Sequence, residues 1–345
     1  MTGIFIAAYS FVASVIGAGF ASGQEILSFF NAYGKWGILG IFLAAGIIGW
    51  FAFFVLSICT QEGIEDYNII LSRLMSKKMM TASRMLTIIF LICSYSAMIA
   101  CFGEMMYMIF DISKLWASVI FTMICATVIC MGADRALKLN GILGIITVTG
   151  IIAAVLYLLR FREHQTMSNA VSSVVSGAGY SGYNLIGAGV ILTKLSKNIK
   201  TRNDALLTGI IISVALAVMM GLIYWILSIY HKYINLGEVP MLTLAMRENK
   251  AITYFYFIML VLAVVTTAVS DGVGINELMN VKPSFGVITS LIALAVSGAG
   301  FSNVINIAYR VCGYLGSAII IYIIINLKKL KKIEKRRKTE NKLDI

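Results

Sequence analysis

Two glycine-rich stretches are the residues of this sequence best suited to binding chemistry. Gly17-Ala18-Gly19-Phe20-Ala21-Ser22-Gly23 lies in the first apolar segment, and Gly177-Ala178-Gly179-Tyr180-Ser181-Gly182 lies about half a chain later. Glycine tolerates non-helical dihedrals and weakens a helix. We expect both segments to unwind there, because free N–H groups at a helix start can hold an anion and free carbonyls at a helix end can hold a cation.

A binding site for a small molecule is therefore predicted from the exposed backbone and short side chains of these stretches. Its residues are Gly17, Ala18, Gly19 and Ser22 in the first stretch, and Gly177, Gly179, Tyr180 and Ser181 in the second. The alternative is that small residues only let helices pack closely. A third copy, Gly298-Ala299-Gly300, falls at a predicted turn and keeps that alternative open.

Three ionisable residues lie within apolar segments: Glu25, Glu104 and Arg310. A charge at membrane depth costs at least about 2.5–3.5 kcal/mol on insertion scales, so each is a functional candidate. We expect Arg310 to pair with Glu25 or Glu104, and the pair to act as a gate above the binding site. The alternatives are a static ion pair or side chains that extend to the membrane interface.

The elements that carry these residues are hydrophobic helices. The chain has 345 residues, of which 59% are hydrophobic and 13% charged, whereas soluble domains carry about 25% charged residues. This excludes a soluble enzyme and a disulfide scaffold, and favours an all-α polytopic membrane protein. The ten predicted spans are 3–30, 36–58, 84–110, 113–132, 139–159, 168–193, 205–229, 251–270, 285–300 and 303–327.

The spacing of the two glycine stretches predicts an inverted repeat. They fall in spans one and six, so five spans separate them and the second half enters the membrane from the opposite side. We predict a 5+5 arrangement with spans one and six broken. The first repeat covers about 3–159 and the second about 168–327, within one transmembrane domain over 1–327. Residues 328–345 form a tail.

The charge distribution predicts orientation and partners. The net charge is +12, and much of the excess is in the tail, between Lys328 and Lys342. A basic tail after a span indicates a cytoplasmic flank that contacts anionic lipid rather than nucleic acid. We expect a multi-pass protein of the cytoplasmic membrane with both termini inside. The sequence indicates no obligatory protein partner. His164 and His231 are far apart, and no cysteines form a CxxC pair, so no zinc site is expected.

The string VIGAGFASGQEILSFF, from Val15 to Phe30, resembles the opening of the YkvI-type bacterial membrane proteins. These are similar to the amino acid–polyamine–organocation transporters with the LeuT fold. The resemblance implies a sodium ion between the broken first span and span eight, bound by carbonyls of Ala13 and Ile16 and by Ala263, Thr266 and Thr267. The alternative is that the two threonine hydroxyls bond back to their own helix.

These observations together predict a secondary active transporter that moves an amino acid or similar small solute by alternating access. Coupling to sodium in symport is expected before coupling to protons, with no other cofactor. The alternative is a solute sensor of the same fold that does not transport. The chain contains neither an HExxH nor a GxSxG motif, so no catalytic residues are predicted and we do not expect an enzyme.

Overall fold

The computed structural model describes residues 2–63, 75–132, 146–147, 149–158, 170–186, 188–230 and 237–340. Within these ranges the chain is helical and has no β-strand, which confirms the all-α prediction. Both histidines, the beginning of the fifth predicted span and residues 341–345 of the predicted tail lie outside the described residues.

Five helices in the described part of the chain are long and apolar enough to cross a membrane. The last of them begins at α15 (Phe301–Val304), passes through a π-helical turn, η4 (Ile305–Tyr309), and continues as α16 (Arg310–Glu340). The other four are α4 (Gly37–Glu62), which follows the 3₁₀ turn η1 (Asn31–Trp36), α6 (Lys77–Phe110), α11 (Arg202–Tyr230) and α13 (Lys250–Met279). These helices are compatible with a multi-pass membrane protein.

The described residues also form shorter apolar helices: α1 (Thr2–Val15), α7 (Lys114–Cys130), Thr149–Leu158 and α14 (Gly286–Ser297) after the turn η3 (Pro283–Phe285). Helix α1 has 14 residues, about 21 Å at 1.5 Å per residue, which is less than the ~30 Å of a hydrocarbon core. By length and composition, the described part of the chain thus contains five candidate spans. The ten-span inverted repeat remains a prediction.

Short polar side chains define where the long helices begin and end. The Ser76 side chain accepts the Met79 N–H at 3.3 Å at the start of α6, and Asn249 accepts the Ile252 N–H at 3.0 Å at the start of α13. Such N-caps satisfy N–H groups that have no partner within the helix. Asp111 and Asn280 end the same two helices in the left-handed region, with φ of 55° and 54°.

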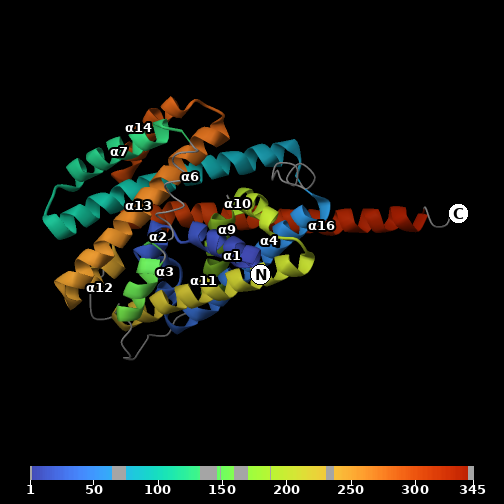
Figure 1. The fold of residues 1–345 in the computed structure, drawn as a ribbon, viewed down its shortest axis with the longest axis horizontal. Helices are drawn as coiled ribbons and strands as arrows, with labels where there is room; N and C mark the ends of the chain where they lie inside the picture. Colours follow the sequence, from blue (N-terminus) through green and yellow to red (C-terminus); the bar gives the residue numbers. More distant parts are fainter. Residues whose placement is uncertain are drawn as a thin grey trace.

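The helices form two groups (Figure 1). In one group α6 packs on α13, α7 and α14, and α7 also contacts α13 and α14. In the other group α4 packs on α11 and on α9 (Ala170–Ile186), α9 packs on α16, and α1 packs on α11. The α10 helix (Ala188–Leu195) contacts α4 and α1. Helix α16 extends beyond both groups toward the C-terminus (Figure 1).

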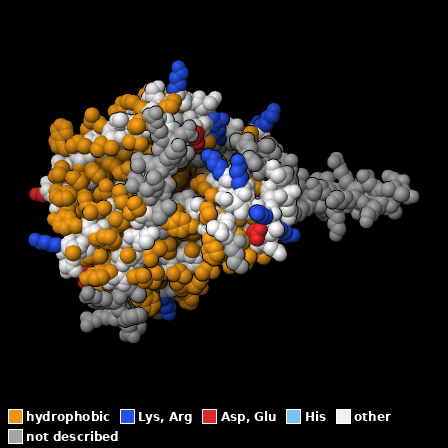
Figure 2. Space-filling view, in the orientation of Figure 1, with side chains coloured by type: hydrophobic (Ala, Val, Ile, Leu, Met, Phe, Trp, Pro, Cys, Tyr) orange, Lys and Arg blue, Asp and Glu red, His pale blue; other side chains and the backbone are white. Residues whose placement is uncertain are grey.

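The outer surface of the bundle is largely apolar. Figure 2 shows hydrophobic side chains over much of one face. Leu115, Trp116, Ile307 and Val171 are each more than 60% exposed. A soluble monomer rarely exposes continuous apolar area on this scale, whereas lipid-facing helices must.

Helix α9 is continuous over Gly177, Gly179 and Gly182, so the predicted unwinding of this stretch is wrong. Added Cβ atoms show why glycine is present. At Gly177 the new atom would meet the Gly40 backbone of α4, and at Gly182 it would meet the Gly313 carbonyl of α16. The glycines allow α9 to approach two helices closely, and this packing offsets their weak helix propensity. Helix α9 is described as far as Ile186, beyond the glycines, and α10 begins at Ala188, after residue 187, which lies outside the described residues.

Candidate functional site

The first apolar segment is interrupted, as predicted. Helix α1 ends at Val15, and after Ile16 and Gly17 the chain resumes as α2 (Ala18–Ala21). Gly17 is extended, with φ −87° and ψ −175°. A second interruption follows at Gly23, whose φ of 79° favours glycine. The chain then forms α3 (Gln24–Phe29).

Neighbouring helices satisfy backbone groups that the interruptions leave without a helical partner. The Tyr256 hydroxyl of α13 donates to the Ala21 carbonyl at 2.5 Å, and the Met241 N–H of α12 (Pro240–Glu248) donates to the Ser22 carbonyl at 2.9 Å. Unpaired buried backbone groups are costly, particularly in lipid. Helices α12 and α13 therefore hold the irregular segment in place.

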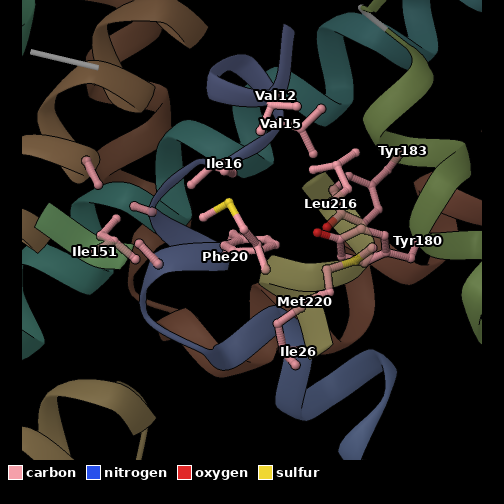
Figure 3. Close-up of a cluster of buried hydrophobic side chains, with 14 of the residues drawn as sticks. Val12, Val15, Ile16, Phe20, Ile26, Ile151, Tyr180, Tyr183, Leu216 and Met220 are labelled. Atoms are coloured by element: carbon pink, nitrogen blue, oxygen red, sulfur yellow. The ribbon is translucent and has the colours of Figure 1, made fainter. Parts of the chain in front are cut away.

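The interrupted segment lies in the interior of the protein. Ala18, Phe20, Ala21 and Ser22 have no exposed surface. Figure 3 shows Ile16 and Phe20 among buried side chains of α1, α9 and α11, including Val15, Tyr180 and Leu216. The backbone at the interruption is therefore enclosed by the surrounding helices.

The predicted sodium-site residues are partly brought together. The Thr267 hydroxyl accepts the Ala18 N–H at 3.3 Å, joining the middle of α13 to the interruption. The Thr266 hydroxyl instead donates to carbonyls of its own helix, with Leu262 at 2.9 Å and Ala263 at 3.0 Å. For Thr266 the structure therefore shows the alternative to an ion ligand, a hydroxyl that bonds back to its own helix. Ala263 is buried and Ala13 half-buried, and Ile16 lies at the interruption itself.

The predicted solute-site residues divide between two environments. Gly17, Ala18 and Gly19 lie at the interruption, where Ser22 donates to the Gly19 carbonyl at 2.8 Å and accepts the Gln24 N–H at 3.2 Å. On α9, Gly177 and Gly179 serve packing against α4 and α16, and Ser181 bonds back to the Ala178 carbonyl at 2.8 Å. Tyr180 is fully buried, with its ring 5.6 Å from Phe29 and 5.0 Å from Phe30.

Glu25 lies directly beside the interruption. Its side chain is 5% exposed, and one carboxylate oxygen accepts the Tyr183 hydroxyl at 2.6 Å. Its other oxygen is so close to Gly19 that a Cβ there would collide with it. Glycine at position 19 is therefore explained by the approach of a carboxyl group. The sequence singled out Glu25, but its partner Tyr183 was missed because the two are far apart along the chain.

The predicted gate pair does not form in this structure. Glu104 forms an ion pair with Lys114 at the start of α7, the helix that follows α6. The Arg310 guanidinium donates to the Ser28 carbonyl at 2.5 Å and to the Ser28 hydroxyl at 3.3 Å, and lies 5.7 Å from the centre of the Phe29 ring. A carbonyl and a π-face stabilise the cation without a carboxylate. Arg310 therefore joins α3 to the beginning of α16.

Comparison with known proteins gives one distant relative. No family model matches the chain. The chain is similar to the uncharacterized protein YyaD of Bacillus subtilis (strain 168), with 25% identity over 333 residues, which cover 90% of this chain and 93% of the relative. The similarity spans nearly the whole of both chains. The resemblance to YkvI-type proteins and to amino acid–polyamine–organocation transporters remains a prediction.

Proposed function

We propose that this protein is a secondary active transporter of a small zwitterionic or neutral solute, such as an amino acid, in the cytoplasmic membrane. The observation that carries the proposal is the interruption of the first apolar helix at Ile16 and Gly17. Irregular backbone at membrane depth is tolerated where protein covers it or where it lines a cavity, and in transporters it binds solutes and ions. Here it is buried, contacted by Thr267 and adjacent to Glu25.

The division into two helix groups supports alternating access. The interrupted segment lies between them: α1 packs on α11, whereas α2 packs on α13 and α6. Movement of the α4–α9–α11 group against the α6–α7–α13–α14 group would open the enclosed backbone first to one side and then to the other. In the proposed 5+5 arrangement α9 and the four shorter apolar helices complete ten spans, both termini are cytoplasmic and the basic tail contacts anionic lipid.

Sodium is the coupling ion we propose for the contact between α2 and α13. Its ligands would be the carbonyls of Ala13, Ile16 and Ala263 with the hydroxyls of Thr266 and Thr267. Both hydroxyls would have to turn from their present hydrogen bonds toward the ion. Oxygen ligands of this kind suit a small hard cation.

Thermal unfolding of the purified protein tests this site, with the proteinogenic amino acids screened in sodium and in choline chloride. The proposal predicts that at least one amino acid stabilises the protein, more strongly with sodium, and that Thr267→Val removes the sodium effect. Thr127→Val is the matched control, because that exposed hydroxyl bonds only to its own helix, at the Met123 carbonyl 2.9 Å away. A sodium effect that persists in Thr267→Val would remove the site.

A solute sensor of the same fold is the second candidate, since it would use the same enclosed backbone. The distinguishing measurement is flux. A sensor would be stabilised by its solute in the thermal assay and would move none of it across a sealed proteoliposome.

A further inference from the structure

Two carboxyl groups are buried in the bundle, and neither forms an ion pair with any residue the structure describes. Glu25 of α3 is 5% exposed and Asp271 of α13 is 7% exposed. One Asp271 oxygen has no hydrogen-bond partner among the described residues. An ionised carboxylate without a cation is costly in this environment, whereas a protonated carboxyl is neutral. Both side chains are therefore candidate proton carriers.

The groups that face Glu25 are mainly tyrosines. From α9, the Tyr183 hydroxyl donates to the carboxylate, and Tyr180 also interacts with it. From η4 and α16, Tyr309 lies within electrostatic range, while Arg310 bonds to Ser28 instead. Lys35 of η1 forms no ion pair with Glu25, and its ammonium group lies 5.5 Å from the centre of the Trp36 ring. The Tyr224 hydroxyl of α11 donates to the Gly34 carbonyl at 2.6 Å.

Asp271 has a similar environment. The Ser94 side chain of α6 interacts with its carboxyl group. Arg84 of α6 donates to the Leu278 carbonyl rather than to Asp271. Tyr95 of α6 and Tyr309 of η4 also lie within electrostatic range of Asp271.

Hydroxyl groups extend from each acid toward the other. The Tyr309 hydroxyl donates to Ser94 at 3.1 Å, and Ser94 contacts Asp271. At the other end Tyr183 donates to Glu25. The rings of Tyr183 and Tyr309 are in contact, with centroids 5.1 Å apart. Tyr309 lies in the π-helical turn η4, a distortion often found at functional sites.

We propose that Glu25 and Asp271 are two proton-binding sites connected by Tyr183, Tyr309 and Ser94, and that a proton passes between them during the conformational cycle. The cycle itself rests on the proposed transport function. The proton that binds Glu25 converts its carboxylate to the neutral acid. On transfer each hydroxyl releases its proton to the next group as it accepts one, so Asp271 becomes neutral and Glu25 is again a carboxylate.

The contact between Tyr183 and Tyr309 is the point at which the cycle would control this transfer. Tyr183 is on α9 and Tyr309 is in η4, which packs on α6. Their rings touch, but a proton can cross only when the two hydroxyls are brought within hydrogen-bonding distance of each other. Movement of α9 relative to η4 would make or break that connection and would link proton transfer to access.

Infrared difference spectroscopy of the full-length protein in nanodiscs, titrated from acid to alkaline pH, tests the two proton sites without any solute. The proposal predicts a carbonyl band of protonated carboxylic acids that falls as pH rises. Glu25→Gln and Asp271→Asn should each remove one component, and Tyr183→Phe should shift the Glu25 component because its hydrogen bond is lost. Glu277→Gln, which changes an exposed carboxyl on α13, should leave these components unchanged.

Bands that are unaltered in Glu25→Gln and in Asp271→Asn would overturn the proposal. Tyr183→Phe keeps both acids and changes a single hydroxyl, so it tests the Glu25 component if an acid variant fails to fold. A component that does not shift in Tyr183→Phe would contradict the assignment to Glu25.

A second measurement separates this inference from the proposed function. Proteoliposomes that contain a pH-sensitive dye are given an inward pH gradient and a mixture of the proteinogenic amino acids, and proton entry and amino acid uptake are followed together. Tyr309→Phe should slow proton entry by about tenfold or more. Amino acid uptake without proton entry would overturn the proton pathway and leave the transporter intact. If the two carboxyl groups titrate but no amino acid is taken up, the transport function would be rejected and the two proton-binding sites would stand.

Discussion

At the scale of single residues, the interruption of the first helix is stabilised by side chains that are distant in the sequence. Tyr256 is the clearest case, because its hydroxyl bonds to the Ala21 carbonyl in a fully buried position. The residue types of this segment predicted the interruption, since Gly17, Gly19 and Gly23 occur close together. The groups that hold it could not be predicted, because Tyr256 and Thr267 reach it only through the tertiary fold.

Removing the Tyr256 hydroxyl tests this support. Tyr256→Phe leaves the Ala21 carbonyl buried without its donor, and we expect destabilisation of about 1–3 kcal/mol, measured by thermal or denaturant unfolding in detergent. Tyr254→Phe is the control, because Tyr254 lies on the same helix and is 47% exposed. Equal stability of the two variants would show that the hydrogen bond does not hold the segment.

Arg310 is expected to matter through α3 rather than through a carboxylate. Arg310→Ala removes charged hydrogen bonds worth about 1.5–3 kcal/mol from the end of α3. We expect the protein to be destabilised by about this amount and solute uptake to fall, because α3 lies next to the interrupted segment. Arg247→Ala at an exposed position is the control. Uptake at the wild-type rate would dismiss a role for Arg310 in transport.

At the scale of helices, similar sequence patterns have different structural roles. The first glycine stretch interrupts the helix on both sides of the short α2, whereas the second lies in the middle of α9 and packs against α4 and α16. Glycine permits either an interrupted or a continuous helix, and the groups that pack against the glycines determine which of the two forms. At Gly19 a carboxyl group occupies the space above the glycine, and at Gly177 another backbone does. Composition alone carries no information on what approaches a glycine.

Alanine substitutions distinguish close packing from simple helix propensity. In Gly177→Ala the new methyl group meets the Gly40 backbone, which cannot move as a flexible side chain would. We expect a loss of about 1–3 kcal/mol of stability, measured by unfolding. Gly46→Ala on α4 meets no atom within 4 Å and should be neutral or stabilising by up to about 1 kcal/mol. The packing account fails if both substitutions have the same effect.

At the scale of the whole molecule, the number of spans determines the topology. The five long helices alone would place the termini on opposite sides of the membrane, whereas ten spans would place both on the same side. Hydropathy predicted the long helices well, because their apolar runs are continuous. Helices α1 and α14, with 14 and 12 residues, are shorter than the predicted spans that contain them.

Reporter fusions in a bacterial host test the ten-span topology. Green fluorescent protein fused to either terminus should fluoresce, and alkaline phosphatase fused to either terminus should be inactive, because both ends are cytoplasmic in the proposed arrangement. An active phosphatase at one terminus would reject an even number of spans. It would also reject the inverted repeat.

Solute flux tests the central claim most directly. The purified protein is reconstituted into sealed liposomes, and uptake of radiolabelled amino acids is measured under sodium and proton gradients, with empty liposomes as the control. The account predicts that at least one amino acid accumulates against its gradient, and that dissipating the ion gradient abolishes the accumulation. No accumulation of any amino acid under either gradient, by protein that unfolds cooperatively and is correctly inserted, would contradict it.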